Sequence, residues 1–409
     1  MELIGPISQL VSLQDLALKG PINDSALHTI SNAGIAIEDG TIKAVDTWDA
    51  LLAAYPKAMI TELNGAYVAV PGYVDCHTHI CFGGNRARDF ALRNAGVSYL
   101  EIAKSGGGIW DTVTQTRKCT EQELTQIVIK NANKLLQLGV TTIEVKSGYG
   151  LSVEEEIKML RAINSGNSET AADLVATCLA AHLKPKDFNG SNEDYLHYLV
   201  TNLFPVLQSE NLTKRIDAFI ETSAFSASEI APYLQAAKAF NFDITIHADQ
   251  FTTSGSEVAV QYEAISADHL EASGDKEIEI IAQSKTIAVA LPGASVGLGC
   301  AFAPARKIID KGGALAIASD WNPGSAPMGD LVCQASILAT FEKLTTAEVF
   351  AGITFRAAAA LNLFDRGRLI AGNKADFILY PSTDYREILY YQGSMRPSKI
   401  WKSGKLVSA

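Results

Sequence analysis

The stretch Ala69–Phe90 reads AVPGYVDCHTHICFGGNRARDF and places His77 and His79 one residue apart at the end of an apolar run. The whole chain of 409 residues contains only seven histidines. Residues i and i+2 of a strand face the same side of a sheet, so we expect the two imidazoles to point in one direction. Two imidazoles on one face supply half of a tetrahedral metal shell. The pair alone is equally compatible with two histidines that hydrogen-bond to carbonyl groups of the core.

Short apolar runs alternate with helix-like segments from this stretch onward. Segments such as ELTQIVIKNANKLLQLG and ASEIAPYLQAAKAFN have helical periodicity and end in Gly or Asn. The eight runs are VAVPGYVDC, TTIEVKS, LVATCLAAH, RIDAFIE, FDITIHAD, AISADHL, IAVALP and LAIASD. Eight such units predict an α/β fold, a parallel (β/α)8 TIM-like barrel. A doubly wound sheet is the alternative, but it more often has GxGxxG after its first strand, and CFGGNRA lacks that spacing.

The two ends of the chain differ from the middle. Asp39-Gly40 and Ser403-Gly404 are hairpin-turn signals between strand-like runs. We therefore expect a small composite β-domain built from both ends, with the barrel between them. The predicted ranges are 1–66 and 361–409 for the β-domain and 67–360 for the barrel.

Composition excludes several classes of protein. The net charge is −11 without a run of Lys or Arg, so we expect no nucleic-acid partner. No apolar run reaches the ~18–20 residues of a membrane span, and the N-terminus lacks a signal pattern, which predicts a cytoplasmic protein. The cysteines show no CxxC spacing, so they indicate reduced core residues and no structural zinc finger. They are Cys76, Cys81, Cys119, Cys178, Cys300 and Cys333.

Further residues that bind metals or move protons end other predicted strands. His247 ends the fifth strand, His269 the sixth, and Asp320 the eighth. Active sites on (β/α)8 barrels lie at the carboxyl ends of the strands. Chance placement of four histidines and an aspartate on one rim is improbable, so the sequence predicts a metal site there.

The motifs at these positions resemble the amidohydrolase superfamily and, more narrowly, the imidazolonepropionase family. They are CHTHICFGGNRARDFALR, SYLEIAKSGGGI, TTIEVKSGYGL, HADQ, ADHLE and SDWNPGSAP. The resemblance implies that water opens the ring of 4-imidazolone-5-propanoate, a small-molecule substrate in histidine degradation, to give N-formimidoyl-L-glutamate. It also implies a homodimer and one divalent metal held by four side chains. These ligands are His77, His79, His247 and Asp320.

The same resemblance suggests roles in catalysis. Zinc and iron both accept these donors, and a metal lowers the pKa of its water from about 15.7 toward ~7. Asp320 would also accept the proton of the water, and His269 either shares that role or only orients its neighbours. Many relatives carry a carbamylated lysine on the fourth strand, where this chain offers Glu221. Lys146 falls on the second strand, so we expect one metal, unless the strand count is off by one and Glu221 is a ligand.

Several residues match substrate contacts of the family. Arg86 matches the arginine that binds the substrate carboxylate, whereas its neighbour Arg88 serves as the comparison, since either could be a solvated charge. His182 would polarise the ring carbonyl or, alternatively, be a hydrogen-bonded core histidine. The segment after Asp320 is turn-forming in any protein, and a tight turn can also present N–H groups to a ligand. The remaining predicted contacts are Tyr99, Tyr149, Gln250, Asn322, Gly324 and Ser325. PGASVGLG is expected to be the loop after the seventh strand.

Two other functions remain open from sequence. A nucleobase deaminase or a hydantoinase-like cyclic amidase would share the metal site but would not need Arg86, Tyr149 and His182 together. A non-catalytic scaffold would typically have lost metal ligands, and all four are present here.

Overall fold

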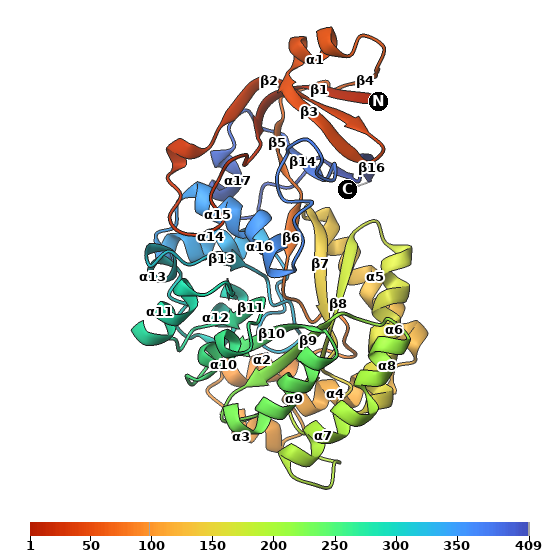
Figure 1. Ribbon diagram of the computed structural model, residues 1–409, viewed down its shortest axis with the longest axis vertical. Coiled ribbons are helices and arrows are strands. Elements are labelled where there is room, and N and C mark those ends of the chain that lie inside the picture. Colours follow the sequence, from red (N-terminus) through yellow and green to blue (C-terminus); the bar gives the residue numbers. More distant parts are fainter. Residues whose placement is uncertain (98, 408–409) are drawn as a thin grey trace.

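The computed structural model describes residues 1–97 and 99–407, except the side chains of residues 99, 100 and 103. The chain forms a barrel and a second β-rich unit, and the N-terminal and C-terminal strands meet in that second unit (Figure 1). This arrangement confirms the fold class predicted from the sequence.

Eight parallel strands form the barrel and pair in sequence order. Each coincides with one of the eight apolar runs. The open edge closes at the carboxyl ends of the first and last strands, where Thr78 pairs with Trp321 and the Asp320 N–H donates to the His77 carbonyl oxygen at 3.0 Å. The strands are β6 (Tyr73–Asp75), β7 (Val140–Lys146), β8 (Asp173–Ala181), β9 (Arg215–Ile220), β10 (Asp243–Ala248), β11 (Ser266–His269), β12 (Ile287–Ala290) and β13 (Leu315–Ile317).

Helices follow the barrel strands, and side-chain caps begin several of them. Thr120 and Glu123 form a capping box at the start of α5, and Ser226 and Glu229 form one at α9. The helices outside the second unit are α2 (Ala87–Asn94), α3 (Tyr99–Lys104), α4 (Ile109–Lys118), α5 (Glu121–Gln137), α6 (Val153–Glu169), α7 (Asn192–Asn202), α8 (Phe204–Ser209), α9 (Ala227–Ala239), α10 (Gly255–Gln261), α11 (Asp275–Gln283), α12 (Pro292–Leu298), α13 (Ala305–Asp310), α14 (Leu331–Glu342), α15 (Thr346–Gly352) and α16 (Phe355–Ala360).

The second unit is one mixed sheet of strands from both ends of the chain. Asp39 and Gly40 join β2 to β3 with φ of 50° and 78°, and Ser403 and Gly404 join β15 to β16 with φ of 47° and 75°. These positive values are those of a type I′ hairpin turn. The strand order is β16-β15-β14-β5-β1-β2-β3, with β4 beside β1. The elements are β1 (Glu2–Val11), β2 (Thr29–Glu38), β3 (Thr41–Thr47), α1 (Trp48–Ala54), β4 (Met59–Glu62), β5 (Val68–Pro71), β14 (Phe377–Tyr380), β15 (Lys399–Lys402) and β16 (Lys405–Val407). Two further short helices from the chain ends, η1 (Asp24–Ala26) and α17 (Arg386–Tyr390), contact the barrel helices α15 and α14.

The first apolar run divides into two strands, where the sequence predicted one. β5 pairs with β1 and β14 in the second unit, whereas β6 pairs with β7 in the barrel. Gly72 lies at the break, and a Cβ at this position would come within 2.4 Å of the Thr141 Oγ1 atom. The chain thus passes between the two units where only glycine fits. The predicted domain boundaries remain a prediction.

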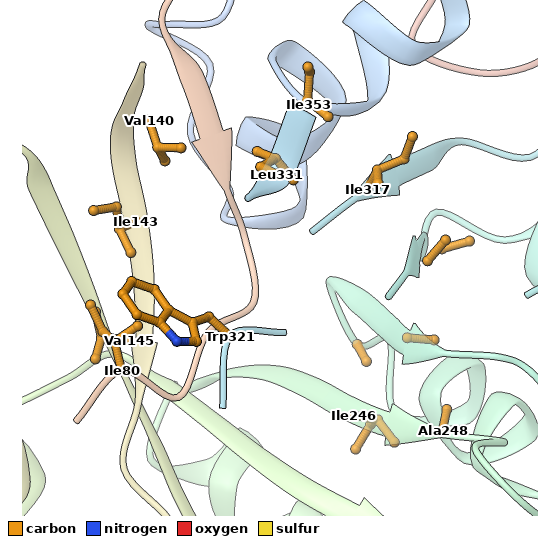
Figure 2. Close-up of a cluster of buried hydrophobic side chains, with 14 of the residues drawn as sticks. Ile80, Val140, Ile143, Val145, Ile246, Ala248, Ile317, Trp321, Leu331 and Ile353 are labelled. Carbon is orange, nitrogen blue, oxygen red and sulfur yellow. The ribbon is translucent and has the colours of Figure 1, made fainter. Parts of the chain in front are cut away.

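Part of the barrel core packs around Trp321, where the first and last barrel strands meet. Figure 2 shows Trp321, the residue after Asp320, in a buried cluster with Ile80 and Val145. This packing fixes the segment that carries Asp320. Among the described residues, no helix has the length and apolarity needed to span a membrane.

Two smaller expectations are wrong. PGASVGLG forms the short helix α12 rather than a loop, because Pro292 at its first position is compatible with a helix start. The described cysteines are free, as expected, but Cys300 is exposed and Cys119 and Cys333 are only half-buried. For Cys119 the sequence neighbours Lys118 and Thr120 are polar and already favoured a position outside the core.

Candidate metal centre and active site

Three predicted histidine ligands converge at the carboxyl ends of two strands. His77 and His79 follow β6, and His247 lies near the end of β10. One ring nitrogen from each lies within 4.8 Å of the other two, and all three residues are buried. Burial lowers the pKa of His77 well below its ordinary value and that of His247 to about 3. Neutral imidazoles of this kind have lone pairs available for a metal.

Asp320, which follows the last barrel strand β13, completes the cluster at the same rim. Its Oδ1 atom lies 3.5 Å from the His77 Nε2 atom and 3.4 Å from the His79 Nε2 atom, and the two Nε2 atoms are 3.3 Å apart. Bonds of 2.0–2.1 Å to a tetrahedral ion place ligand atoms about 3.3–3.4 Å apart. Burial opposes ionisation of Asp320, but neighbouring histidines, His79 first, outweigh it and hold the carboxyl pKa low. This donor set fits a divalent metal.

Two buried aspartates hold the far nitrogens of the metal-facing histidines. Asp268 Oδ2 accepts a hydrogen bond from His77 Nδ1 at 2.6 Å, and Asp217 Oδ2 lies 2.9 Å from His247 Nδ1. Lys146 Nζ lies 2.8 Å from Asp217 and 3.8 Å from Asp268. A carboxylate on Nδ1 fixes the tautomer in which Nε2 offers its lone pair to a metal. Sequence reasoning missed both aspartates, although each lies in a quoted strand, RIDAFIE and AISADHL.

Neither alternative ligand for a second metal belongs to the cluster. Lys146 lies on β7, as predicted, and contacts Glu144 at 2.8 Å as well as the two aspartates. Glu221, directly after β9, accepts hydrogen bonds from the backbone N–H groups of Thr222 at 2.8 Å, Phe251 at 2.9 Å and Thr252 at 3.0 Å. Its carboxylate therefore holds the loop that follows β10.

His269 lies beside the cluster rather than within the group of converging nitrogens. Its ring centre is 5.3 Å from that of His247 and 5.8 Å from that of His77. His269 and Asp320 have φ of 88° and 49°, in the left-handed region that few non-glycine residues adopt. Burial lowers the pKa of His269, but the Glu271 carboxylate, 3.4 Å from Nδ1, outweighs it and raises the pKa overall. Glu271 is a third residue, after Asp217 and Asp268, whose role sequence reasoning missed.

His182 and Tyr149 flank the histidines on the side of β7 and β8. The His182 Nδ1–H donates to the Gly148 carbonyl oxygen at 2.9 Å, and its ring stacks on His79 with centres 6.0 Å apart. Burial lowers the pKa of His182 to about 4. In the neutral ring Nε2 therefore accepts a hydrogen bond, and donation to an oxyanion would require the protonated form. Tyr149 is buried, and its ring centre lies 5.8 Å from that of His182.

Of the predicted substrate contacts after β13, Gly324 lies against the guanidinium of Arg86. A Cβ on Gly324 would lie 2.4 Å from Arg86 Nη1, so only glycine allows this approach. Asn322 Oδ1 accepts from the N–H groups of Gly324 and Ser325, while its Nδ2 donates to Asp320 Oδ2 at 2.9 Å. The turn therefore orients the carboxylate of Asp320, and the guanidinium of Arg86 lies against the same turn.

The other residues singled out from the sequence are less buried or lie outside the described residues. Gln250 is half-buried in the loop after β10. Arg88 is exposed, and its Nη1 donates to the Ser105 carbonyl oxygen at 3.3 Å. The side chain of Tyr99 lies outside the described residues.

Known proteins match this chain over almost its full length. A sequence model described as the Amidohydrolase family matches residues 68–407. The imidazolonepropionase of Bacillus cytotoxicus is 38% identical over 410 residues, covering 99% of this chain and 96% of the relative. The chain belongs to the amidohydrolase family, among the imidazolonepropionases. A model of an imidazolonepropionase-like composite domain of bacteria matches residues 33–58, and the imidazolonepropionase of Bacillus mycoides is 38% identical over 93% of this chain and 90% of its own.

Solved structures share the fold of this chain at low sequence identity. A triazine hydrolase variant superposes with a TM-score of 0.78 at 15% identity, covering 100% of this chain and 94% of its own. An adenosine deaminase from Xanthomonas campestris with bound zinc has a TM-score of 0.72 at 15% identity, over 100% and 93% of the two chains. At this identity the likeness establishes the fold alone.

Proposed function

We propose that this chain hydrolyses the ring amide of 4-imidazolone-5-propanoate to N-formimidoyl-L-glutamate. The observation that carries the proposal is the position of Arg86. Its guanidinium lies against Gly324, in the same turn that orients the carboxylate of Asp320. A cation beside a hydrolytic centre suits a substrate that carries a carboxylate on a side chain of its ring. Deamination of a neutral nucleobase gives such an arginine no partner.

The reaction adds water across one carbon–nitrogen bond. The oxygen of water bonds to the carbonyl carbon of the ring, the bond from that carbon to the ring nitrogen breaks, and the released nitrogen takes a proton. The new carboxylate becomes the α-carboxylate of the product. A bound divalent metal would supply a water of lowered pKa and polarise the carbonyl. His77, His79, His247 and Asp320 would hold it, and we infer one zinc or iron per chain.

Three side chains would handle the proton and orient the ring. Asp320 is ionised and can take the proton of the attacking water, and His269, with its pKa raised by Glu271, can deliver a proton to the leaving nitrogen. The Nε2 atom of neutral His182 would accept an N–H of the ring. This role replaces donation to the carbonyl oxygen, because the Nδ1–H of His182 is already bonded to Gly148.

The other predicted properties are proposals of the same kind. Tyr149, Gln250, Asn322, Gly324 and Ser325 are proposed as substrate contacts, and Tyr99 keeps this role from sequence alone. We infer a cytoplasmic homodimer with no nucleic-acid partner.

The test is turnover of freshly prepared imidazolone propionate by metal-loaded protein, followed as loss of ultraviolet absorbance. Guanine, cytosine and hydantoin are run in parallel as substrates of the alternative enzymes. We expect turnover of the imidazolone only. Turnover of guanine, cytosine or hydantoin with none of the imidazolone would overturn the proposal.

A further inference from the structure

A buried aspartate contacts the guanidinium of Arg86. Asp89, on α2, is 4% exposed, and its Oδ2 atom accepts a hydrogen bond from Arg86 Nε at 3.0 Å. The Arg86 side chain itself is only 8% exposed. The contact uses Nε and leaves both terminal Nη groups free of Asp89. A carboxylate ligand can bind that pair of terminal groups in the two-point manner typical of arginine.

The start of α4 fixes Asp89 in turn. The same Oδ2 atom accepts the backbone N–H of Gly108 at 2.8 Å. A Cβ on the preceding residue, Gly107, would lie 2.3 Å from Asp89 Oδ1, so the backbone packs directly on the carboxylate. Gly108 has a φ of 80°, a conformation that favours glycine. The SGGGI segment of the sequence thus forms a close-fitting seat for Asp89.

Arg86 is therefore held from two sides by groups that belong to different parts of the barrel rim. Asp89, itself fixed by the Gly108 N–H, accepts from its Nε, and Gly324, from the turn after β13, lies against Nη1. An arginine fixed in this way loses little further side-chain entropy when a ligand binds. A free arginine on a loop would have to lose that entropy on binding.

We propose that Asp89 is a positioning residue that sets the chain's preference for ring substrates with a carboxylate side chain, acting only through Arg86. This inference rests on the proposed function. It assigns to Asp89 no contact with the substrate and no part in the chemical step. Its effect should therefore fall on binding of the carboxylate, and be absent for a ring that lacks one.

The test compares Asp89→Asn, Arg86→Ala and the double variant on two substrates, imidazolone propionate and unsubstituted 4-imidazolone. Asparagine keeps an oxygen that can accept the Gly108 N–H but removes the charge that holds Arg86. We expect Asp89→Asn to lower kcat/KM for imidazolone propionate by about 10-fold to 100-fold, mainly through KM. Its kcat/KM for unsubstituted 4-imidazolone should stay within about twofold of wild type. The double variant should match Arg86→Ala alone, because Asp89 has no effect once its partner is gone.

Asp111→Asn is the matched control, since it makes the same change in the first turn of α4, where Asp111 Oδ1 accepts a hydrogen bond from Gln115 rather than from Arg86. Calorimetric binding of imidazole-4-propionate, compared with 4-methylimidazole, gives a second readout that needs no catalysis. Equal losses on both substrates would mean general damage to the fold and would overturn the inference, as would wild-type kinetics of Asp89→Asn. Failure of the wild-type protein to turn over either imidazolone would instead count against the proposed function.

Discussion

Replacing Asp268 with asparagine should weaken metal binding while leaving the fold intact. Asp268 accepts the Nδ1–H of His77 at 2.6 Å, and its side chain is 1% exposed. A hydrogen bond to a charged group contributes about 1.5–3 kcal/mol, and one between neutral groups about 0.5–1.5 kcal/mol. Asparagine can still accept this hydrogen bond as a neutral group, so the loss is about 1–2 kcal/mol, or about 5-fold to 30-fold in the metal Kd.

The surrounding charges are expected to limit the effect of Asp268→Asn to its contact with His77. Lys146 lies 2.8 Å from both Glu144 and Asp217 but 3.8 Å from Asp268, so its ammonium keeps two close carboxylates in Asp268→Asn. We expect the melting temperature to change by a few degrees at most, because 1 kcal/mol shifts it by about 2–4 °C in a protein of roughly 150–250 residues and by less in a larger one.

The assay is competition for zinc between the protein and a chromophoric chelator, with Asp310→Asn, an exposed carboxylate, as the control. Asp268→Ala should lose more affinity than Asp268→Asn, because it removes the acceptor as well as the charge. An unchanged Kd in both Asp268 variants would refute the reasoning that this carboxylate orients His77 for the metal.

Elemental analysis should find about one metal per chain, and two tightly bound ions would contradict the single site that the converging side chains form. Arg86→Ala should raise KM and lower kcat/KM by roughly 10²-fold, whereas Arg88→Ala, which changes an exposed side chain, should have little effect; equal losses would contradict the assignment. His269→Asn should retain its metal while kcat falls by ~10²–10⁴, and loss of the metal would make this residue a ligand. Glu271→Gln should move the basic limb of the kcat/KM profile to lower pH, because His269 must be protonated to donate to the leaving nitrogen and loss of the carboxylate lets its pKa fall. A basic limb that stays in place or moves to higher pH would contradict this coupling.

The barrel could be predicted because parallel strands covered on both faces are short apolar runs, and all eight runs became strands. The division of VAVPGYVDC between two sheets could not, because every residue in both halves is buried and the break depends on a close approach of Gly72 to Thr141. Local pattern does not record which sheet a buried strand joins. The same holds for α12, whose residues carry no strong helical periodicity.

The candidate site was predictable where a side chain that binds metal or transfers protons lies at the end of a strand, as His77 and Asp320 do. Asp217 was missed because it lies inside a strand among apolar neighbours, and Asp268 because it directly precedes His269, the residue that marked the end of that strand. Their partners come from other strands, and only the register of the closed barrel brings Asp268 to His77, 191 residues away in sequence. Asp89 was missed for a related reason, since its contacts depend on how α2 packs on α4.

The most direct test of the account is the identity of the product formed from imidazolone propionate in H2¹⁸O by the metal-loaded protein. Attack of water at the ring carbonyl carbon predicts N-formimidoyl-L-glutamate with one ¹⁸O atom in its α-carboxylate, detected by mass spectrometry with fragmentation. Attack at the carbon between the two ring nitrogens would instead give N-formylisoglutamine with the label in the formyl group. That second product would contradict the account. So would a substrate that disappears no faster with the protein than by its spontaneous decay.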